Sequence, residues 1–320
     1  MTDSDSRCWP LVEVEPAQLQ TLLAPVLAGA ALIDVKRVEG GLINTLYRIT
    51  PAGGGVSLCL RIFAAGQRPW QTERNVLARV AAALPVPQVL LADCGGGSFP
   101  HPYLVYRWIE GMTLDECRRR MPPAAFLSLA EPLGRLLARM ASLPFADAYK
   151  GQASAAPVAA LLAVNEGRLR RGLARAHLGA ALADALWQRL EAGAGRLGAL
   201  DRAACLVHGD LGGRNILVAP AGDGAWRVSG LIDWEAAFSG AALWDVGRVF
   251  RYARRYSETF RERFERAYRE AGGDLPEDWW RTARLLDATR LVEILNEERE
   301  LSVVFAECRE LIEAVVADWA

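Results

Sequence analysis

Residues 206–218 read LVHGDLGGRNILV, and residues 231–235, beyond a hairpin turn, read LIDWE. Each stretch contains a short apolar run, which is typical of a buried strand. Asp210 and Asn215 flank a tight loop, and Asp233 ends the strand that follows the hairpin. We expect the hairpin to return on itself and to bring these three polar side chains together.

Two carboxylates and one amide in this arrangement suit phosphoryl transfer. One carboxylate can accept the proton of a hydroxyl group, while the amide and the other carboxylate hold Mg²⁺ on the phosphates. Oxygen ligands of this kind are the ones that Mg²⁺ prefers. The alternative is ordinary loop polarity, since Asp and Asn are common turn residues.

A metallohydrolase built on His208, Asp210 and Asp233 is a second alternative. It would need further histidine ligands, but the chain has three histidines in all. The other two, His101 and His177, lie in no ligand-like motif. This composition favours phosphoryl transfer over zinc chemistry.

The first third of the chain is predicted to be rich in strands. The expected strands cover residues 34–39, 42–50, 56–63, 88–92 and 103–109, and one helix is expected at about 70–83. Glu73 shares the apolar face of that helix, and a buried carboxylate is costly unless it is paired. We therefore expect Arg61, in the preceding strand, to be its partner, with a plain structural ion pair as the alternative to a functional one.

After Gly111 the pattern becomes mainly helical. Helices are expected at about 124–143, 158–172 and 180–197 and over most of 257–319. Thr113 and Glu116 have the spacing of a capping box, and Pro132 is expected to kink the first of the long helices. The shift in composition predicts a domain boundary that divides the chain into residues 1–110 and 111–320.

The quoted segments resemble the aminoglycoside phosphotransferase and choline kinase superfamily. The shared features are H-G-D-x-x-x-x-N at residues 208–215, a hydrophobic strand, and I-D-W-E at 232–235, and the resemblance extends over about residues 35–250. It implies an α+β, bilobal protein-kinase-like fold with a small β-rich N-lobe and a large, mainly helical C-lobe. Residues 1–110 would then bind nucleotide, and residues 111–320 would carry the catalytic and substrate-binding groups.

The resemblance also implies roles for single residues of the catalytic segment. Asp210 would be the catalytic base, and Asn215 and Asp233 would be the magnesium ligands. His208 would brace the catalytic loop, and Asp245 would buttress it.

Further implied roles concern the nucleotide. Gly40 and Gly41 resemble the turn that covers it, and Arg61 stands where a phosphate-binding lysine is usual, with Glu73 as its helix partner. Residues 103–111 resemble the hinge that holds adenine through backbone groups, at Arg107 and Ile109. Arginine in place of lysine keeps the charge but changes the geometry.

The implied activity is transfer of the γ-phosphate of ATP or GTP, with Mg²⁺, to the hydroxyl group of a small molecule. A protein substrate is disfavoured, because Gly209 stands where protein kinases have arginine and the short run from Asp233 to Asp245 leaves no room for an activation loop. Aminoglycosides are the first expected acceptors; choline, homoserine, a sugar, a macrolide or another natural product are alternatives. A pseudokinase that binds nucleotide without turnover is a third possibility, which Arg61 encourages.

The bulk composition limits the classes of molecule that the chain is expected to bind. The formal net charge is −1, so no basic excess points to nucleic acid or to an anionic membrane, and no obligate protein partner is implied. None of the six cysteines forms a C-x-x-C pair, which fits a reducing cytoplasm.

The C-terminal helices offer one clue to the acceptor. Asp287, Arg290, Glu293 and Glu297 recur at helical spacing, and an acidic pocket there would attract a polycation. A solvated helix face is the favoured alternative. Trp279 and Trp280 are expected to serve packing rather than a ligand pocket.

Overall fold

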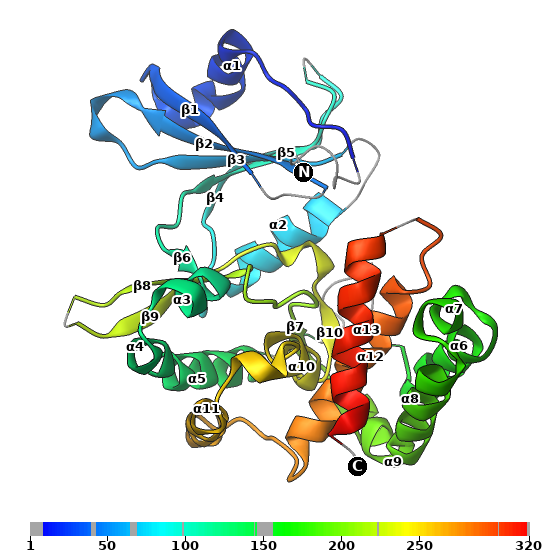
Figure 1. The fold of residues 1–320 in the computed structure, drawn as a ribbon. Helices are drawn as coiled ribbons and strands as arrows, with labels where there is room; N and C mark the ends of the chain where they lie inside the picture. Colours follow the sequence, from blue (N-terminus) through cyan, green and yellow to red (C-terminus); the bar gives the residue numbers. More distant parts are fainter. Residues whose placement is uncertain are drawn as a thin grey trace. The chain divides into compact units, whose positions relative to one another are not determined.

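The computed structural model describes residues 9–39, 43–64, 69–97, 99–143, 145, 156–222, 224–299 and 301–318. Contacts group them into two compact units (Figure 1). The first unit holds the described residues up to Met112 together with Leu217–Ala219 and Ser229–Ala236. The second holds Thr113–Ile216, Pro220–Val228 and the described residues from Ala237 onward.

A five-stranded antiparallel sheet forms the centre of the first unit. Its strands are β1 (Leu32–Val38), β2 (Thr45–Pro51), β3 (Leu58–Ile62), β4 (Val89–Asp93) and β5 (Tyr103–Arg107). They lie in the order β1-β2-β3-β5-β4, and each neighbouring pair is antiparallel. All five expected strands are confirmed, with ends that shift by a few residues.

Two helices accompany this sheet. Helix α2 (Pro69–Val80) confirms the expected helix, with Glu73, Val76, Leu77 and Val80 on its buried side. Helix α1 (Pro16–Leu27) was not expected; its buried leucines join the core that the sheet residues Ile49 and Leu60 also line. Apolar burial of this kind contributes about 25 cal/mol per Å².

The quoted hairpin also contributes to the first unit. Strands β8 (Ile216–Pro220) and β9 (Trp226–Leu231) belong to a three-stranded sheet with β6 (Met112–Thr113), in the order β6-β8-β9. The 3-10 turn η4 (Trp234–Ala236) follows, and it packs against α2. Trp234 is fully buried there, and its indole Nε1 donates to the carbonyl of Leu231 at 2.9 Å. This anchoring fixes Asp233 between the end of β9 and η4.

The second unit is mainly helical (Figure 1). Its helices are α3 (Leu114–Arg120), α4 (Pro123–Leu127), α5 (Ala130–Ala141), α6 (Val158–Arg171), α7 (Leu173–Leu178), α8 (Ala180–Ala192), α9 (Ala194–Gly198), α10 (Leu243–Val249), α11 (Glu258–Glu270), α12 (Trp279–Ile294) and α13 (Ser302–Ala317). Strands β7 (Cys205–Val207) and β10 (Phe238–Gly240) pair antiparallel within it. The capping box is confirmed: Thr113 Oγ1 accepts from the Glu116 amide, and Glu116 accepts from the Thr113 amide.

The prediction that Pro132 kinks a long helix is wrong. The chain forms two helices, α4 and α5, which are separated at Ser128 and Leu129. Pro132 then lies in the first turn of α5, where a backbone N–H has no helical partner to lose.

Helix crossings in the second unit are close because glycines lie at two of them. A Cβ atom on Gly134 of α5 would lie 2.4 Å from the carbonyl oxygen of Phe264 in α11. One on Gly247 of α10 would lie 2.3 Å from the carbonyl oxygen of Ala283 in α12. The absence of a side chain at Gly247 thus seats α10, which carries Asp245, directly on α12.

Aromatic side chains fill much of the core around these crossings. The Phe250 ring contacts the rings of Phe264 and Trp279 at centroid distances of 4.9 and 5.8 Å, and Trp280 contacts Phe250 at 5.5 Å. The expectation that the tryptophan pair serves packing is confirmed. Among the described residues, no helix combines the length and the apolar character that a bilayer crossing requires.

Candidate active site

Arg61, in β3 of the first unit, is a buried cation that three carboxylates share. Its Nη2 donates to Asp233 Oδ1 at 2.6 Å and to Glu235 Oε2 at 2.7 Å, and its Nη1 donates to Glu73 Oε1 at 3.2 Å. The expected Arg61–Glu73 pair is present, with side chains 7% and 1% exposed. Burial alone would lower the pKa of Arg61, but Asp233, Glu73 and Glu235 raise it well above its ordinary value.

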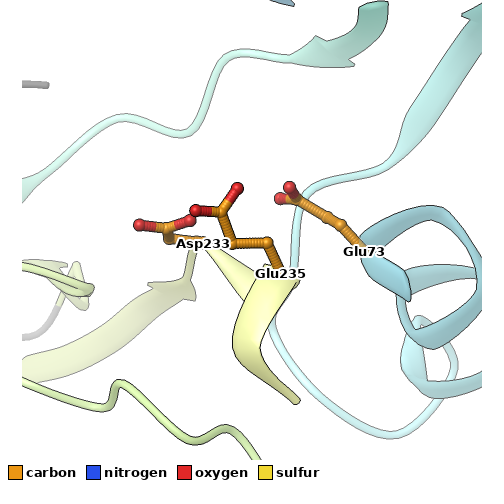
Figure 2. A group of neighbouring side chains, drawn as sticks. All are labelled: Glu73, Asp233 and Glu235. Carbon is orange, nitrogen blue, oxygen red and sulfur yellow. The ribbon is translucent and has the colours of Figure 1, made fainter. Parts of the chain in front are cut away.

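The three carboxylates come from two elements and turn toward one another (Figure 2). Glu73 projects from α2, whereas Asp233 immediately precedes η4 and Glu235 lies within it, and one oxygen of each lies within 4.8 Å of the others. Burial raises the pKa of Glu73 to about 7, against the opposing effect of Arg61. Burial likewise raises the pKa of Glu235. With all three ionised, the three carboxylates and Arg61 together carry a net charge of about −2, which complements a hard divalent cation.

Asp233 also has an unusual backbone. Its φ is +70°, in the left-handed region that residues with a Cβ rarely adopt. Aspartate tolerates this region better than most residues, and such conformations are common at functional sites. The sharp turn after β9 therefore directs the Asp233 carboxylate to Arg61.

Glu235 and Asn44 belong to this cluster, although neither was predicted to. Asn44 Nδ2 donates to Glu235 Oε2 at 2.7 Å, the same oxygen that receives Arg61. Glu235 lies in the quoted LIDWE segment, two residues after Asp233, so its proximity to the predicted ligand was a usable signal. The one signal at Asn44 was its position three residues after the glycine pair Gly40-Gly41.

The second unit holds the loop of Asp210 and Asn215, and these two side chains meet as expected. Asn215 Nδ2 donates to the backbone carbonyl of Asp210 at 2.8 Å and to its Oδ2 at 3.3 Å. Because the NH₂ group of the amide is turned toward Asp210, its carbonyl oxygen is the atom that can coordinate a cation. Asp233 belongs to the other unit, so its expected meeting with Asp210 and Asn215 stays a prediction.

Asp245 holds this loop by its backbone, as the resemblance implied. Its two carboxylate oxygens accept from the amides of His208, at 2.7 Å, and Gly209, at 3.0 Å. Burial raises the pKa of Asp245 to about 7, although both amide hydrogen bonds act to lower it. Gly209 has a φ of +83°, which a residue without a Cβ adopts easily.

His208 braces the loop from inside. Its side chain is fully buried, and its Nδ1 accepts from the Asp210 amide at 3.3 Å. An imidazole that accepts at Nδ1 carries its proton on Nε2 when neutral. The structural role expected for His208 is confirmed.

Arg248, in α10, also contacts the loop of Asp210, and this contact was not predicted. Its Nε and Nη2 donate to Asp210 Oδ1 at 2.8 and 2.6 Å. It lies three residues after Asp245 in α10, so helical spacing places both side chains on one face. That spacing was a signal that the sequence contained.

The residues expected at the adenine hinge lie at the end of β5. Arg107 has an exposed side chain, and its amide N–H donates to the carbonyl of Gln88 at 3.1 Å. A nucleotide base would therefore have to use other backbone groups there, among them those of Ile109, which is half-buried. Gly40 and Gly41 lie outside the described residues.

Asp287 has a different environment from the one expected. It is buried and accepts from Arg251 Nε and Nη2 at 2.7 and 2.6 Å, so it contributes to neither an acidic pocket nor a solvated face. Arg290, one turn on, pairs with Glu293. A buried pair of this kind compensates two desolvated charges rather than attracting a ligand.

The chemistry available to each unit follows from these contacts. The first unit offers acidic oxygens and one guanidinium, which suit a divalent cation and phosphate groups. The second unit offers a carboxylate, 44% exposed, on a loop whose backbone is fixed. An accessible, oriented carboxylate of this kind can accept a proton from a hydroxyl group.

Comparisons with known proteins identify a family, a relative and similar folds. Residues 34–292 match the model of a family described as the phosphotransferase enzyme family. A stretch of 176 residues is 28% identical to viomycin phosphotransferase of Streptomyces vinaceus; the match covers 55% of this chain and 58% of that relative. The chain thus matches less than two thirds of the relative's length.

Solved structures show the same fold. The GDP complex of aminoglycoside 2'-phosphotransferase-IIIa has a TM-score of 0.75 at 18% identity, over 96% of this chain and 100% of the other. A complex of aminoglycoside phosphotransferase APH(4)-Ia with ADP and hygromycin B has a TM-score of 0.65 at 19% identity, over 94% and 99%. The expected kinase-like α+β fold is confirmed.

Proposed function

The chain belongs to the phosphotransferase enzyme family, and from this premise we propose that it transfers the γ-phosphate of ATP or GTP to the hydroxyl group of a small molecule. The observation that carries the proposal is the loop of the second unit, where the Asp210 carboxylate is accessible and held by Asn215 and Arg248. Phosphoryl transfer depends on placing a base and on stabilising charge, and this loop places a base.

Asp210 is the proposed base. The O–H bond of the acceptor breaks, its proton goes to the Asp210 carboxylate, and the acceptor oxygen forms a bond to the γ-phosphorus. The bond between that phosphorus and the bridging oxygen breaks, and the electron pair leaves with the nucleoside diphosphate. His208 and Asp245 hold the backbone that carries Asp210.

Asn215 and Asp233 are the proposed ligands of Mg²⁺, and the donor set fits a hard cation because it offers carboxylate and amide oxygens. Bound Mg²⁺ neutralises charge on the phosphate oxygens. Glu235 is a further candidate ligand, since its Oε2 shares Arg61 Nη2 with Asp233. Arg61, oriented by Glu73, is proposed to bind phosphate with its guanidinium, and Gly40 and Gly41 to cover the nucleotide.

Nucleotide binding is supported by the family's solved complexes, one with GDP and one with ADP. We propose that the base binds beside Arg107 and Ile109 through the backbone. The five described cysteines are free thiols, which fits a reaction in the reducing cytoplasm.

The acceptor is proposed to be an antibiotic. Aminoglycosides come first, because the structural relatives bind hygromycin B or carry aminoglycoside in their names. Viomycin is the second candidate, because the relative that shares 28% of its matched residues phosphorylates viomycin by name.

An acceptor panel tests the proposal. The purified protein is incubated with radiolabelled ATP or GTP, Mg²⁺ and, separately, hygromycin B, kanamycin and viomycin, and the products are identified by mass spectrometry. We expect a phosphorylated product with at least one acceptor and none without Mg²⁺. Nucleotide binding without any phosphorylated product, over a panel widened to choline, homoserine, sugars and macrolides, would favour a pseudokinase instead.

A further inference from the structure

Arg248 directs its guanidinium to one oxygen of Asp210 only. Both Nε and Nη2 donate to Oδ1, at 2.8 and 2.6 Å, whereas Oδ2 receives Asn215 Nδ2 at the longer distance of 3.3 Å. Charge-assisted hydrogen bonds from two N–H groups fix direction as well as distance. The two oxygens of Asp210 are therefore unequal, with Oδ1 held firmly and Oδ2 held weakly.

The Arg248–Asp210 ion pair is partly buried and therefore partly shielded from solvent. The Arg248 side chain is 19% exposed and that of Asp210 is 44% exposed. Many ion pairs of this chain lie farther out; Arg175 and Asp184, for example, are 30% and 56% exposed. Partial burial reduces screening by salt, so the Arg248–Asp210 contact should orient its carboxylate more firmly than a surface pair does.

Helix α10 holds the loop at two points with one face. Asp245 accepts from the backbone amides of His208 and Gly209, and Arg248, three residues later, holds the Asp210 side chain. The contact at Gly209 fixes the path of the chain, but it leaves the χ angles of Asp210 unrestricted. Arg248, together with the longer contact from Asn215, supplies the restraint on those angles.

The close approach of Gly212 agrees with this arrangement. A Cβ atom there would lie 3.7 Å from Arg248 Nε, at ordinary contact distance. The guanidinium thus lies beside the loop at Gly212 as well as at Asp210.

We propose that Arg248 is a positioning residue that anchors Asp210 Oδ1 and presents Oδ2 to the acceptor hydroxyl. This inference rests on the proposed function, since it assigns the proton of that hydroxyl to one named oxygen. Arg248 acts through Asp210 and does not itself bind the transferred phosphate.

Substitution of Arg248 tests the role through kinetics. In Arg248→Met we expect kcat, measured with ATP and whichever of hygromycin B, kanamycin and viomycin is phosphorylated, to fall on the order of 100-fold, because a misplaced catalytic group costs about that much. The KM for ATP should change by no more than about threefold. Arg248→Lys should recover part of the loss, since it keeps the charge but not the two N–H groups that converge on Oδ1.

The Asp210→Asn background separates positioning from phosphate binding. If Arg248 works through Asp210, adding Arg248→Met to Asp210→Asn lowers kcat little further. Multiplicative losses in the double variant, or a loss expressed mainly in the KM for ATP, would contradict the proposal and assign Arg248 to the phosphates. Arg175→Met, which removes the more exposed ion pair between α7 and Asp184 of α8, should leave kcat unchanged.

A stability cycle gives a readout that needs no acceptor. We expect the urea midpoints of Arg248→Met, Asp210→Asn and the double variant to be non-additive, because each single variant breaks the same contact. Additive shifts overturn the pairing, and with it the role of Arg248. A wild type that phosphorylates no acceptor, yet shows the non-additive cycle, contradicts the proposed function and leaves the pairing supported.

Discussion

Arg61 shows how one buried charge can organise a site. Its side chain is 7% exposed, and its guanidinium holds Glu73, Asp233 and Glu235. Removing a charge from water costs several kcal/mol, which the three carboxylates offset. Arginine can reach all three because its donors form a planar fork, whereas the ammonium of lysine is compact.

Loss of that cation is expected to destabilise the protein. Arg61→Met leaves Glu73, which is 1% exposed, without its partner, and breaking a buried pair costs about 3–5 kcal/mol. Urea unfolding should show this loss, while Arg37→Met on the exposed face of β1 should shift the free energy of unfolding by less than about 0.5 kcal/mol. A free energy of unfolding that Arg61→Met leaves unchanged would refute the structural part of this account.

Asp233 allows a test of the proposed metal ligand that keeps the backbone. Asparagine tolerates a φ of +70° as aspartate does, so Asp233→Asn should fold with little strain, whereas Asp233→Ala should also lose stability. Both variants should weaken the Mg²⁺-dependent part of nucleotide binding by roughly 10-fold or more. Calorimetric titration of ATP with and without Mg²⁺ measures this, and an Asp233→Asn protein with wild-type Mg²⁺ dependence would exclude the ligand role.

Among the elements, α10 supplies two of the side chains that hold the Asp210 loop. It carries Asp245 and Arg248, and it contacts α12 through Gly247. Its position therefore depends on α12 (Trp279–Ile294), which begins 30 residues after Val249 ends α10, rather than on its own short length. A substitution that moves α10 away from α12 should therefore also displace the Asp210 loop, which Asp245 and Arg248 contact.

Gly247→Ala tests that dependence. The added Cβ would lie 2.3 Å from the Ala283 carbonyl oxygen, so the helices must separate, at a cost of about 1–3 kcal/mol. We expect a lower melting temperature and a lower kcat. The matched control is Gly167→Ala in α6, where a Cβ meets nothing within 4 Å and the change should stabilise the helix by up to about 1 kcal/mol. If Gly167→Ala changed the melting temperature and kcat as much as Gly247→Ala does, the proposed importance of the contact between α10 and α12 would be contradicted.

Sequence patterns predicted the elements unevenly, for physical reasons. The strands and α2 were predictable because apolar residues recur at the spacing of each element, as at Leu58, Leu60 and Ile62 in β3. Helix α1 was missed, although Leu19, Leu23 and Leu27 repeat at helical spacing. The break before α5 was misplaced because proline marks a helix start as readily as a kink.

For the molecule as a whole, contacts between distant segments were the hardest to predict. Arg61 and Glu235 are 174 residues apart in the chain, and no local pattern at Arg61 indicated a third carboxylate. The Asp210–Asn215 contact, only five residues apart, was predictable from a tight loop. Arg248 lies between these cases: its spacing of three residues from Asp245 was a signal, but the helix that would give the spacing meaning was not predicted.

Stability should depend on pH through Asp245. Its pKa is raised from 3.8 to about 7 by burial, so the folded protein holds a proton that the unfolded chain has released between those values. Its contribution to stability is therefore greatest below about pH 4 and is lost as pH rises to about 7, by up to about 1.4 kcal/mol per pH unit. The urea midpoint of the wild type, compared with that of Asp245→Asn, should fall over this range and then level off. A constant difference between the two proteins from pH 4 to 8 would contradict the raised pKa.

The most direct test of the central claim is the rate of phosphoryl transfer by Asp210→Asn. Asparagine keeps the size of the side chain but cannot accept the acceptor's proton. We predict that kcat falls by about 10²- to 10⁴-fold, the contribution typical of a general base, while the Kd for ATP with Mg²⁺ stays near that of the wild type. Near-wild-type turnover by Asp210→Asn would contradict the assignment of Asp210 as the base.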